Sequence, residues 1–298
     1  MTTFVQLASS GLALGAVYAL IALGFVVIYR ASEVFNFAHG ELLTIGAFAF
    51  VGLAGMGLPW GLALMGAMVL TGLLGAVLER TLLRPLVGQP VFVVIILTIF
   101  LGAVLRAGIV VIWGTEPFGV PTPWETTGTF ELLGARILWN NLAGVLAGGV
   151  ALGAFFVMIR RSRLGVAMRA TSVDQEVSLA LGIPVGRIFG LSWFIAGALA
   201  ALAGVFLATF PRQLDANLGF VALRAFPAVI VGGLDSVAGP VIAGFVLGLL
   251  EVLAQGYVNP HLGAFGHNFH AVFPYVVMIA FLVVRPHGLF GSADVERL

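Results

Sequence analysis

Long apolar runs separated by short polar segments make up almost the whole chain. Eight of these runs have the character of helices that cross the hydrocarbon core of a bilayer, which is roughly 30 Å thick. They occupy residues 4–29, 42–57, 60–79, 91–112, 139–159, 188–209, 237–256 and 272–284. The pattern predicts an all-α fold, a polytopic transmembrane helical bundle that forms a single domain over residues 1–298.

A ninth apolar piece, from Leu223 to Leu234, is shorter than the others. A helix of this length cannot cross a bilayer, because the helical rise is only about 1.5 Å per residue. We therefore expect a half-helix or a re-entrant segment at this point. Backbone that is not helical is tolerated at membrane depth only where protein or a water-filled cavity covers it.

The arginines are distributed unevenly between the segments that connect the runs. No charge precedes Arg30, so the first run lacks the basic start of a signal peptide. Because basic residues favour the cytoplasmic side, the distribution predicts an external N-terminus and a cytoplasmic C-terminus. The inner segments hold Arg30, Arg80, Arg84, Arg160, Arg161, Arg163, Arg169, Arg187, Arg285 and Arg297, and the outer ones hold Arg136, Arg212 and Arg224. Residues 113–138 form the long outer loop and are expected to be an ordered cap.

Composition narrows the possible chemistry. Hydrophobic residues make up 60% of the chain and charged residues 9%, which excludes a soluble globular protein. The net charge of +1 argues against a nucleic-acid-binding surface. The chain has no cysteine and no lysine, so disulfides, thiolate chemistry and Schiff bases are excluded. A Walker A loop needs a lysine, so no cofactor is expected in this chain and any ATP must be bound by a partner subunit.

Glycines recur at the four-residue spacing that lets membrane helices pack closely. These pairs are Gly11 and Gly15, Gly144 and Gly148, Gly149 and Gly153, and Gly244 and Gly248. In a chain with 40 glycines the spacing also arises by chance. We therefore assign the pairs no specific role from the sequence.

The longest polar interruption covers residues 160–187 and has the marks of a short cytoplasmic helix. Ser172 and Gln175 fit a capping box, and Gly182 followed by Pro184 is a stop signal. An exposed apolar stripe on such a helix would fit a groove in a partner protein. The stripe consists of Val173, Val177 and Leu181. From these residues alone, a connecting loop held inside by its arginines is an equally good interpretation.

Residues 29–41 form an unusually polar connection between two apolar runs. Asn36, His39 and Glu41 lie here among phenylalanines. Such groups are costly in lipid, so they should face water, protein or each other. This favours a functional break that lines a substrate pathway.

The same segment allows two other interpretations. It could be a solvated loop on the inner face, in which Arg30 pairs with Glu33. A metal site at His39 and Glu41 is disfavoured, because two ligands two residues apart without a second cluster are insufficient. The histidines of the last outer loop are expected to be solvated or to face a partner; they are His261, His267 and His270.

A glycine-bounded turn at residues 228–240 separates the short apolar piece from the next run. Transporters use the ends of broken helices to meet charged substrate groups. The candidate pathway residues of this turn are Gly232, Gly233, Asp235 and Ser236.

Ionisable residues within the apolar runs are functional candidates as well. Glu251 is assigned to the substrate pathway, with a structural role as the alternative, and Arg106 is left open between the two roles. Glu79 is expected at the inner boundary beside Arg80, where its side chain can snorkel to water.

Several of these segments resemble the LivH-type permeases of branched-chain amino acid ABC importers. They are Asn36-Phe37-Ala38-His39-Gly40-Glu41 with Gly15-Ala16 and Tyr18-Ala19-Leu20 before it, Arg163-Leu164-Gly165 with Arg169-Ala170, Asp174 and Ala180-Leu181-Gly182, and Arg285-Pro286 with Gly288-Leu289-Phe290-Gly291. The family shows a Gly-Gly-Leu-Gly-Ser pattern where this chain has Asp235, which is a departure. The resemblance runs from Gly11 to Gly291.

The resemblance implies that residues 160–187 dock on a cytoplasmic ATPase. The implied coupling residues are Arg163, Gly165, Arg169, Ala170, Asp174, Ala180 and Gly182. It also implies a place in the cell inner membrane beside a second, LivM-type permease, with two ATP-binding subunits and a periplasmic or extracellular substrate-binding protein.

The expected substrates are branched-chain or related amino acids, and relatives that carry urea, amides or aromatic acids are the alternative. An ion-coupled secondary transporter or channel also uses broken helices, but it has no need for an exposed apolar helix on its inner face. An intramembrane enzyme is disfavoured, because the chain lacks a paired-aspartate or His-Glu-x-x-His signature.

Overall fold

The computed structural model describes residues 2–86, 88–132, 134–209 and 211–291. The α-helices of these residues are α1 (Thr2–Ser32), α2 (His39–Gly55), α3 (Trp60–Leu78), α4 (Val91–Trp113), α5 (Trp139–Arg161), α6 (Arg163–Thr171), α7 (Gln175–Ala180), α8 (Val185–Ala208), α9 (Gly219–Arg224), α10 (Phe226–Gly232), α11 (Ala238–Leu253) and α12 (Phe269–Val284). The chain also forms two short π-helices, η1 (Glu79–Leu83) and η3 (Ala254–Val258), among the described residues. Three short 3₁₀-helices are present there as well: η2 (Arg84–Leu86), η4 (Asn259–His261) and η5 (Gly263–His267). The prediction of an all-α membrane bundle is confirmed, and each of the eight predicted runs coincides with a helix.

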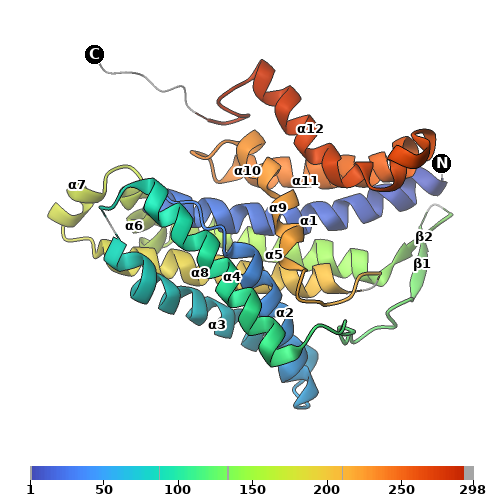
Figure 1. Cartoon of the computed structure of the whole chain (residues 1–298), viewed down its shortest axis with the longest axis horizontal. Helices are drawn as coiled ribbons and strands as arrows, with labels where there is room; N and C mark the ends of the chain where they lie inside the picture. Colours follow the sequence, from blue (N-terminus) through green and yellow to red (C-terminus); the bar gives the residue numbers. More distant parts are fainter. Residues whose placement is uncertain (1, 87, 133, 210, 292–298) are drawn as a thin grey trace.

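The helix α1 runs through the centre of the bundle, along its longest dimension (Figure 1). Of its most apolar stretch, 83% is buried inside the protein, compared with 22% for α4 and for α5. It contacts α11, α8 and α5. The helices α4 and α5 therefore belong to the periphery, where their exposed apolar side chains suit contact with lipid.

Glycines allow α1 and α11 to touch through their backbones. Gly11 and Gly15 of α1 face Leu249 and Phe245 of α11, and a Cβ on Gly248 would lie 2.4 Å from the Cα of Gly15. Small residues permit such close approach, which is a main source of helix association in lipid. Two of the glycine pairs noted in the sequence therefore form one helix crossing.

The other glycine pairs differ from one another in their surroundings. Gly148 faces Ala16 of α1, and Gly144 faces Phe206 of α8. A Cβ on Gly149 or Gly153 would meet nothing within 4 Å. The same four-residue spacing thus marks a packed face in one case and an open face in the other.

The helix α8 is the second central element and joins α2 and α3 to the bundle. A Cβ on Gly204 would lie 2.2 Å from the carbonyl oxygen of Leu43 in α2. A Cβ on Gly75 of α3 would lie 2.7 Å from the carbonyl oxygen of Trp193. These backbone contacts hold α2 and α3 against α8.

The two ends of the bundle carry different structures. Helices α6 and α7 lie at one end, whereas the N-terminus and an antiparallel hairpin lie at the other (Figure 1). The hairpin consists of β1 (Thr129–Leu132) and β2 (Ala135–Leu138). Phe118 and Leu214 also pair through their backbones, which connects the loop after α4 to the loop after α8. We call these the α6–α7 end and the hairpin end.

The breaks between helices differ in detail from the predictions. The helix α1 continues to Ser32 and α2 begins at His39, so the break spans only residues 33–38. It opens at Glu33, whose φ of 56° is left-handed and ends α1. Arg30 lies within α1 and donates to Ser172, so the alternative pairing with Glu33 is wrong. The predicted inner residue Arg297 lies outside the described residues.

The predicted half-helix at 223–234 is two short helices. They are α9 and α10, which start at Gly219 and are separated at Ala225. Residues 219–232 together form an apolar helical stretch that remains shorter than the membrane-length helices.

The predicted capping box at Ser172 is wrong. Ser172 ends α6, and its hydroxyl donates to the carbonyl of Arg169. The helix α7 is capped by Asp174, which accepts from the amide of Val177 at 2.8 Å. Ser162 caps α6 by accepting from Gly165 at 3.0 Å. The segment therefore forms two short helices, because it contains two N-cap residues.

Replacing Gly248 by Ala should destabilise the bundle by about 1–3 kcal/mol, because the added methyl overpacks the α1–α11 crossing. The measurement is the free energy of unfolding in mixed micelles titrated with a denaturing detergent. Gly149→Ala is the control: its Cβ enters open space, and alanine favours helix by up to about 1 kcal/mol. Equal stability of the two variants would contradict this packing of α1 on α11.

Candidate functional site

The break between α1 and α2 is closed by backbone contacts of Asn36. Its Oδ1 accepts from the amide of Ala38 at 3.0 Å, and its carbonyl accepts from the amide of His39 at 3.2 Å. The His39 side chain is fully buried, with its ring centroid 4.7 Å from that of Phe25. Of the predicted pathway residues, Asn36 therefore lies in the break and His39 in the packed first turn of α2.

Glu41, the third predicted residue of this segment, forms an ion pair with Arg106 of α4. Arg106 also lies over the ring of Phe220 in α9, with its Cζ 3.6 Å from the ring centroid. This is a cation–π arrangement. The structure thus brings together three residues from α2, α4 and α9 that are far apart in the sequence.

Two glycines position this three-residue cluster. A Cβ on Gly40 would lie 2.4 Å from the carbonyl oxygen of Gly219, so the first turns of α2 and α9 touch through their backbones. On the other side, a Cβ on Gly102 of α4 would lie 3.9 Å from the Cγ of Glu41, an ordinary van der Waals distance, so α4 borders this side chain. A larger residue at Gly40 would separate α2 from α9.

A second buried cluster surrounds Glu251 in α11. The hydroxyl of Tyr18 donates to Glu251 Oε2 at 2.5 Å, and Arg224 of α9 lies 3.5 Å from Oε1. The side chain of Glu251 is 2% exposed and that of Arg224 is 31% exposed. Both carboxylate oxygens therefore have a partner, which is what a buried charge requires.

A cavity of about 640 Å³ opens beside the Glu251 cluster. Arg212 and His270 line it together with Glu251, and Asn259 lies 2.9 Å from the ring nitrogen Nδ1 of His270. Burial lowers the pKa of Arg212, which lies in the loop after α8. Its lining combines polar side chains, such as Arg212 and Gln255, with apolar ones, such as Leu14 and Val252.

The turn after α10 is held by the C-terminal segment. The amides of Leu289 and Phe290 donate to the carbonyls of Val231 and Gly232. Gly233 has a φ of 94°, which glycine adopts without strain. These contacts assign Gly232 and Gly233 to a packed turn.

Asp235 and Ser236 lie at the α6–α7 end. Ser236 Oγ accepts from the amide of Gly239 at 3.1 Å and so caps α11. Both residues line an open cavity of about 550 Å³ with Arg30 and Arg169. The structure therefore groups these two predicted pathway residues with the predicted coupling residues.

The predicted coupling residues lie on and around α6 and α7. Gly165 is buried where a Cβ would lie 2.2 Å from the carbonyl oxygen of Ile159, and the Arg169 guanidinium donates to the same carbonyl. Gly182 has a φ of 81° and ends the turn after α7. Arg163, Asp174 and Ala180 are exposed, and Ala170 is half-buried.

The stripe predicted on this segment is exposed. Val173 is 84% exposed, Val177 53% and Leu181 75%, and Leu179 adds a fourth apolar side chain. Two hydrogen bonds join the segment to α1, from Arg30 to Ser172 and from Gln175 to the carbonyl of Ala31. The exposed apolar surface is thus fixed to the end of the central helix.

Glu79 and Arg84 form a clamp at the α6–α7 end that the sequence did not reveal. Arg84 Nε and Nη2 donate to the two carboxylate oxygens of Glu79 at 3.0 and 2.7 Å, and Nη2 also donates to the carbonyl of Gly186. Glu79 is 2% exposed, so the expectation that it snorkels to water is wrong. Glu79 and Arg84 are five residues apart, and this spacing matches the π-helical turn η1, so it is the one sequence feature that could have indicated the pair.

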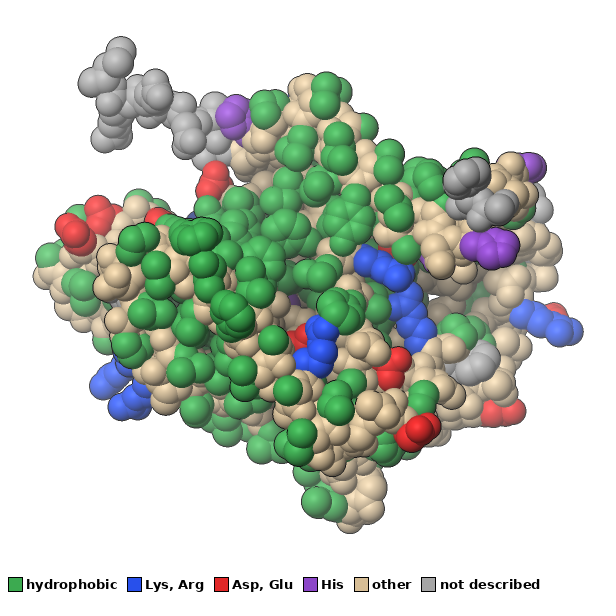
Figure 2. Space-filling model, viewed as in Figure 1, with side chains coloured by type: hydrophobic (Ala, Val, Ile, Leu, Met, Phe, Trp, Pro, Cys, Tyr) green, Lys and Arg blue, Asp and Glu red, His purple; other side chains and the backbone are tan. Residues whose placement is uncertain are grey.

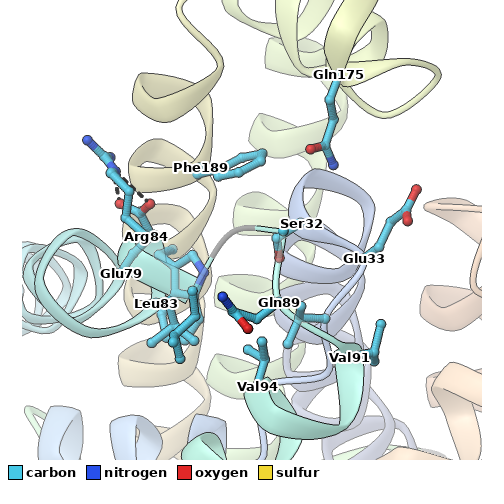
Figure 3. A pocket seen from close by; sticks show the side chains of 14 residues that line it. Ser32, Glu33, Glu79, Leu83, Arg84, Gln89, Val91, Val94, Gln175 and Phe189 are labelled. Carbon is cyan, nitrogen blue, oxygen red and sulfur yellow. Dashed lines mark hydrogen bonds and ion pairs between the residues drawn. The ribbon is translucent and has the colours of Figure 1, made fainter.

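A pocket of about 210 Å³ lies beside this clamp. Figure 3 shows Arg84 and Glu79 on one side of it, Ser32 and Glu33 on the other, and Gln89 between them. Gln175 and Phe189 close its far end. The pocket therefore lies between the end of α1, the turns η1 and η2, and the start of α8.

Among the described residues, no three His, Asp or Glu side chains lie together as metal ligands would. Of the outer histidines, His270 contacts Asn259. Metal chemistry consequently has no donor set in the part of the chain that the structure describes.

One face of the molecule places charge among apolar side chains. Figure 2 shows arginine and acidic side chains close together near the middle of that face, over the region of α2, α4 and α9, with hydrophobic side chains around them. The side chain of Arg106 is 27% exposed. A charge exposed to lipid at this depth is costly, so this face requires water or another protein.

Comparison with known proteins gives consistent matches over the whole chain. The model of the family described as "Branched-chain amino acid transport system / permease component" matches residues 7–282. The high-affinity branched-chain amino acid transport system permease protein LivH of Escherichia coli is 30% identical over 99% of this chain and 98% of its own length. The corresponding permease protein BraD of Pseudomonas aeruginosa is 29% identical over the same shares.

One solved structure shares the fold. PsaBC from Streptococcus pneumoniae, in complex with Fab, superposes with a TM-score of 0.52. The match covers 94% of this chain and 92% of that chain at 12% sequence identity. At this identity the likeness concerns the arrangement of helices alone.

Replacing Arg84 by Ala should cost roughly 3 kcal/mol of stability, because it leaves the buried Glu79 carboxylate without its partner. The measurement is again the free energy of unfolding in mixed micelles. Arg136→Ala is the control: Arg136 and Glu131 lie 3.9 Å apart on the hairpin, and both are about three-quarters exposed. Such a pair contributes at most about 1 kcal/mol, so similar losses in both variants would refute the clamp.

Proposed function

The chain belongs to the family of permease components of branched-chain amino acid transport systems, and we propose that it carries branched-chain or related amino acids through a pathway along α2, α4 and α9. The family makes it the multi-pass permease subunit of an importer. The observation that supports the position of the pathway is the partly exposed charge of Arg106 and Arg224 at membrane depth. A zwitterionic amino acid needs charged side chains along its pathway in order to leave water.

The helix α9 supplies much of this lining. Phe220 is 50% exposed and lies four residues before Arg224, so the two side chains share one face of the helix. Charged and aromatic groups on the surface of a membrane bundle fit a partner subunit or a water-filled pathway better than lipid. A second, LivM-type permease packed against this face would enclose the pathway between the two chains.

An aromatic cluster closes the pathway toward the α6–α7 end. Phe35 and Phe37 of the α1–α2 break lie 5.6 and 6.1 Å from Phe226 at the start of α10, centroid to centroid. Phe25 of α1 is 6.0 Å from the same ring. Movement of α10 would part these rings, which gives the inner gate that alternating access requires.

The α6–α7 segment is the surface on which a cytoplasmic ATPase subunit docks. Its apolar stripe is exposed, and its polar contacts with Arg30 and Ala31 connect it to α1. Short amphipathic helices bind grooves through such stripes. This chain lacks the lysine of a Walker A loop, so the ATP is bound by partner subunits. Two such subunits are expected, one for each permease.

The orientation in the inner membrane follows from the same arginines. Arg160, Arg163, Arg169 and Arg187 gather at the α6–α7 end, and the basic side of a membrane protein faces the cytoplasm. The hairpin end and the N-terminus then face outward, toward a substrate-binding protein. The C-terminal segment, which packs on the turn after α10, lies inside.

Proteoliposomes that hold the assembled importer should accumulate L-leucine only when ATP and the ATPase subunits are present inside. Without the ATPase, uptake should fall to the passive leak. The measurement is uptake of labelled leucine with and without an imposed proton or sodium gradient. Uptake that continues without the ATPase and follows the ion gradient would instead identify a secondary transporter.

Replacing Val177 by Asp should release the ATPase from the permease. A charge in a docked apolar contact leaves it desolvated and unpaired, which costs about 2 kcal/mol or more and weakens binding about thirtyfold. The measurement is the amount of ATPase that co-purifies with the tagged permease. Leu132→Asp, at an equally exposed apolar position on β1, should retain the ATPase, and loss of binding in both variants would contradict the docking surface.

A further inference from the structure

Three acid–arginine pairs lie within or at the edge of the helical bundle, and their hydrogen bonding differs. In the Glu79–Arg84 pair both carboxylate oxygens accept from the guanidinium. In the Glu251 pair one oxygen accepts from Tyr18 and the other faces Arg224. In both of these pairs, each carboxylate oxygen therefore has a partner.

The Glu41–Arg106 pair leaves two of its polar atoms without a hydrogen-bond partner. Arg106 Nη2 donates to Glu41 Oε1, but Glu41 Oε2 and Arg106 Nε are buried and have no hydrogen-bond partner among the described residues. Buried polar atoms normally have partners, and each exception needs an explanation. The unsaturated atoms comprise one acceptor and one donor, from opposite members of the pair.

The pair is also accessible from one side. The Arg106 side chain is 27% exposed, whereas the Glu41 side chain is 5% exposed. The ring of Phe220, in the six-residue helix α9, covers the guanidinium, and α9 is separated from α10 at Ala225. Displacement of this short helix would open both charged groups to the pathway.

We propose that Glu41 and Arg106 bind the charged ends of the transported amino acid, with Arg106 taking the carboxylate and Glu41 the ammonium. A guanidinium suits bidentate recognition of a carboxylate, and Nε–H can be one of the two donors in such a contact. Insertion of a zwitterion between the two side chains keeps every charge paired, which limits the cost of separating a buried pair. In the absence of substrate the two side chains neutralise each other.

The ring of Phe220 then faces the remaining part of the substrate. It lies against the guanidinium and is half exposed, so an aliphatic side chain could pack on it. This inference rests on the proposed function, and it adds that the permease itself requires both a free carboxylate and a free ammonium.

The test uses the assembled importer in proteoliposomes, with labelled L-leucine as the probe. Glu41→Gln and Arg106→Gln should each lower the rate of leucine uptake by about thirtyfold or more, the factor for truncating one partner of a buried charged contact. ATP hydrolysis by the same complexes should stay within about twofold of the unaltered importer, a change smaller than 0.5 kcal/mol. Glu79→Gln removes a carboxylate of similar burial outside the pathway and should leave the uptake per ATP hydrolysed unchanged.

The charge-reversed double variant Glu41→Arg/Arg106→Glu separates substrate binding from structure. A purely structural pair is restored by the reversal, whereas a substrate-binding pair stays defective because the charges now lie beside the wrong helices. Recovery of uptake to within about threefold of the unaltered importer, or less than 1 kcal/mol, would overturn the proposal. If the reversed variant does not assemble, the two glutamine variants decide, and normal uptake in either one overturns it.

Failure of this proposal is distinguishable from failure of the proposed function. If the unaltered importer does not take up leucine with ATP, the proposed function is at fault. If the unaltered importer takes it up and the glutamine variants do so equally well, only the assignment of Glu41 and Arg106 is wrong.

Discussion

The backbone contact between α1 and α11 is the constraint on which the rest of the bundle depends. Lipid tails are as apolar as leucine side chains, so helices in a membrane associate through close packing and not through exclusion of water. Gly15 and Gly248 provide that packing by letting the two backbones meet. The resulting central helix is buried on most of its surface, and the breaks before α2 and after α10 are covered by protein because they lie against it.

The breaks in turn determine where charge can lie. The break at residues 33–38 lets α2 begin beside the C-terminal half of α1, where His39 packs on Phe25, and its first turn meets α9 through Gly40 and Gly219. Continuous helices would carry these polar groups to the membrane surface. Interrupted helices instead hold Glu41 at depth, next to Arg106 on an intact neighbour.

The sequence predicted the helices well and the contacts between them poorly. Apolar runs are local, so a helix could be located at each of the eight predicted runs, although among the described residues only six helices have membrane-crossing length, and α2 and α12 are shorter. The exposed stripe of α7 followed from spacing. The partner of Glu41 lies 65 residues away and that of Glu251 lies 233 residues away, and no local pattern encodes such pairs. Helix ends were misplaced at His39 because a buried polar residue can continue a helix when its neighbours enclose it.

One continuous segment connects the charged residues at the α6–α7 end with the two acid–arginine pairs of α9. Asp235 shares a cavity with Arg30 and Arg169 beside the proposed ATPase surface. From there the chain runs back through α10 to α9, where Phe220 touches Arg106 and Arg224 faces Glu251. Under the proposed function, a shift of α6 and α7 would reach the turn after α10 through this cavity, and α10 and α9 would carry it to both charged pairs. The break at Ala225 matters for this reason: α9 and α10 can shift separately, whereas a single spanning helix would have to move as a whole.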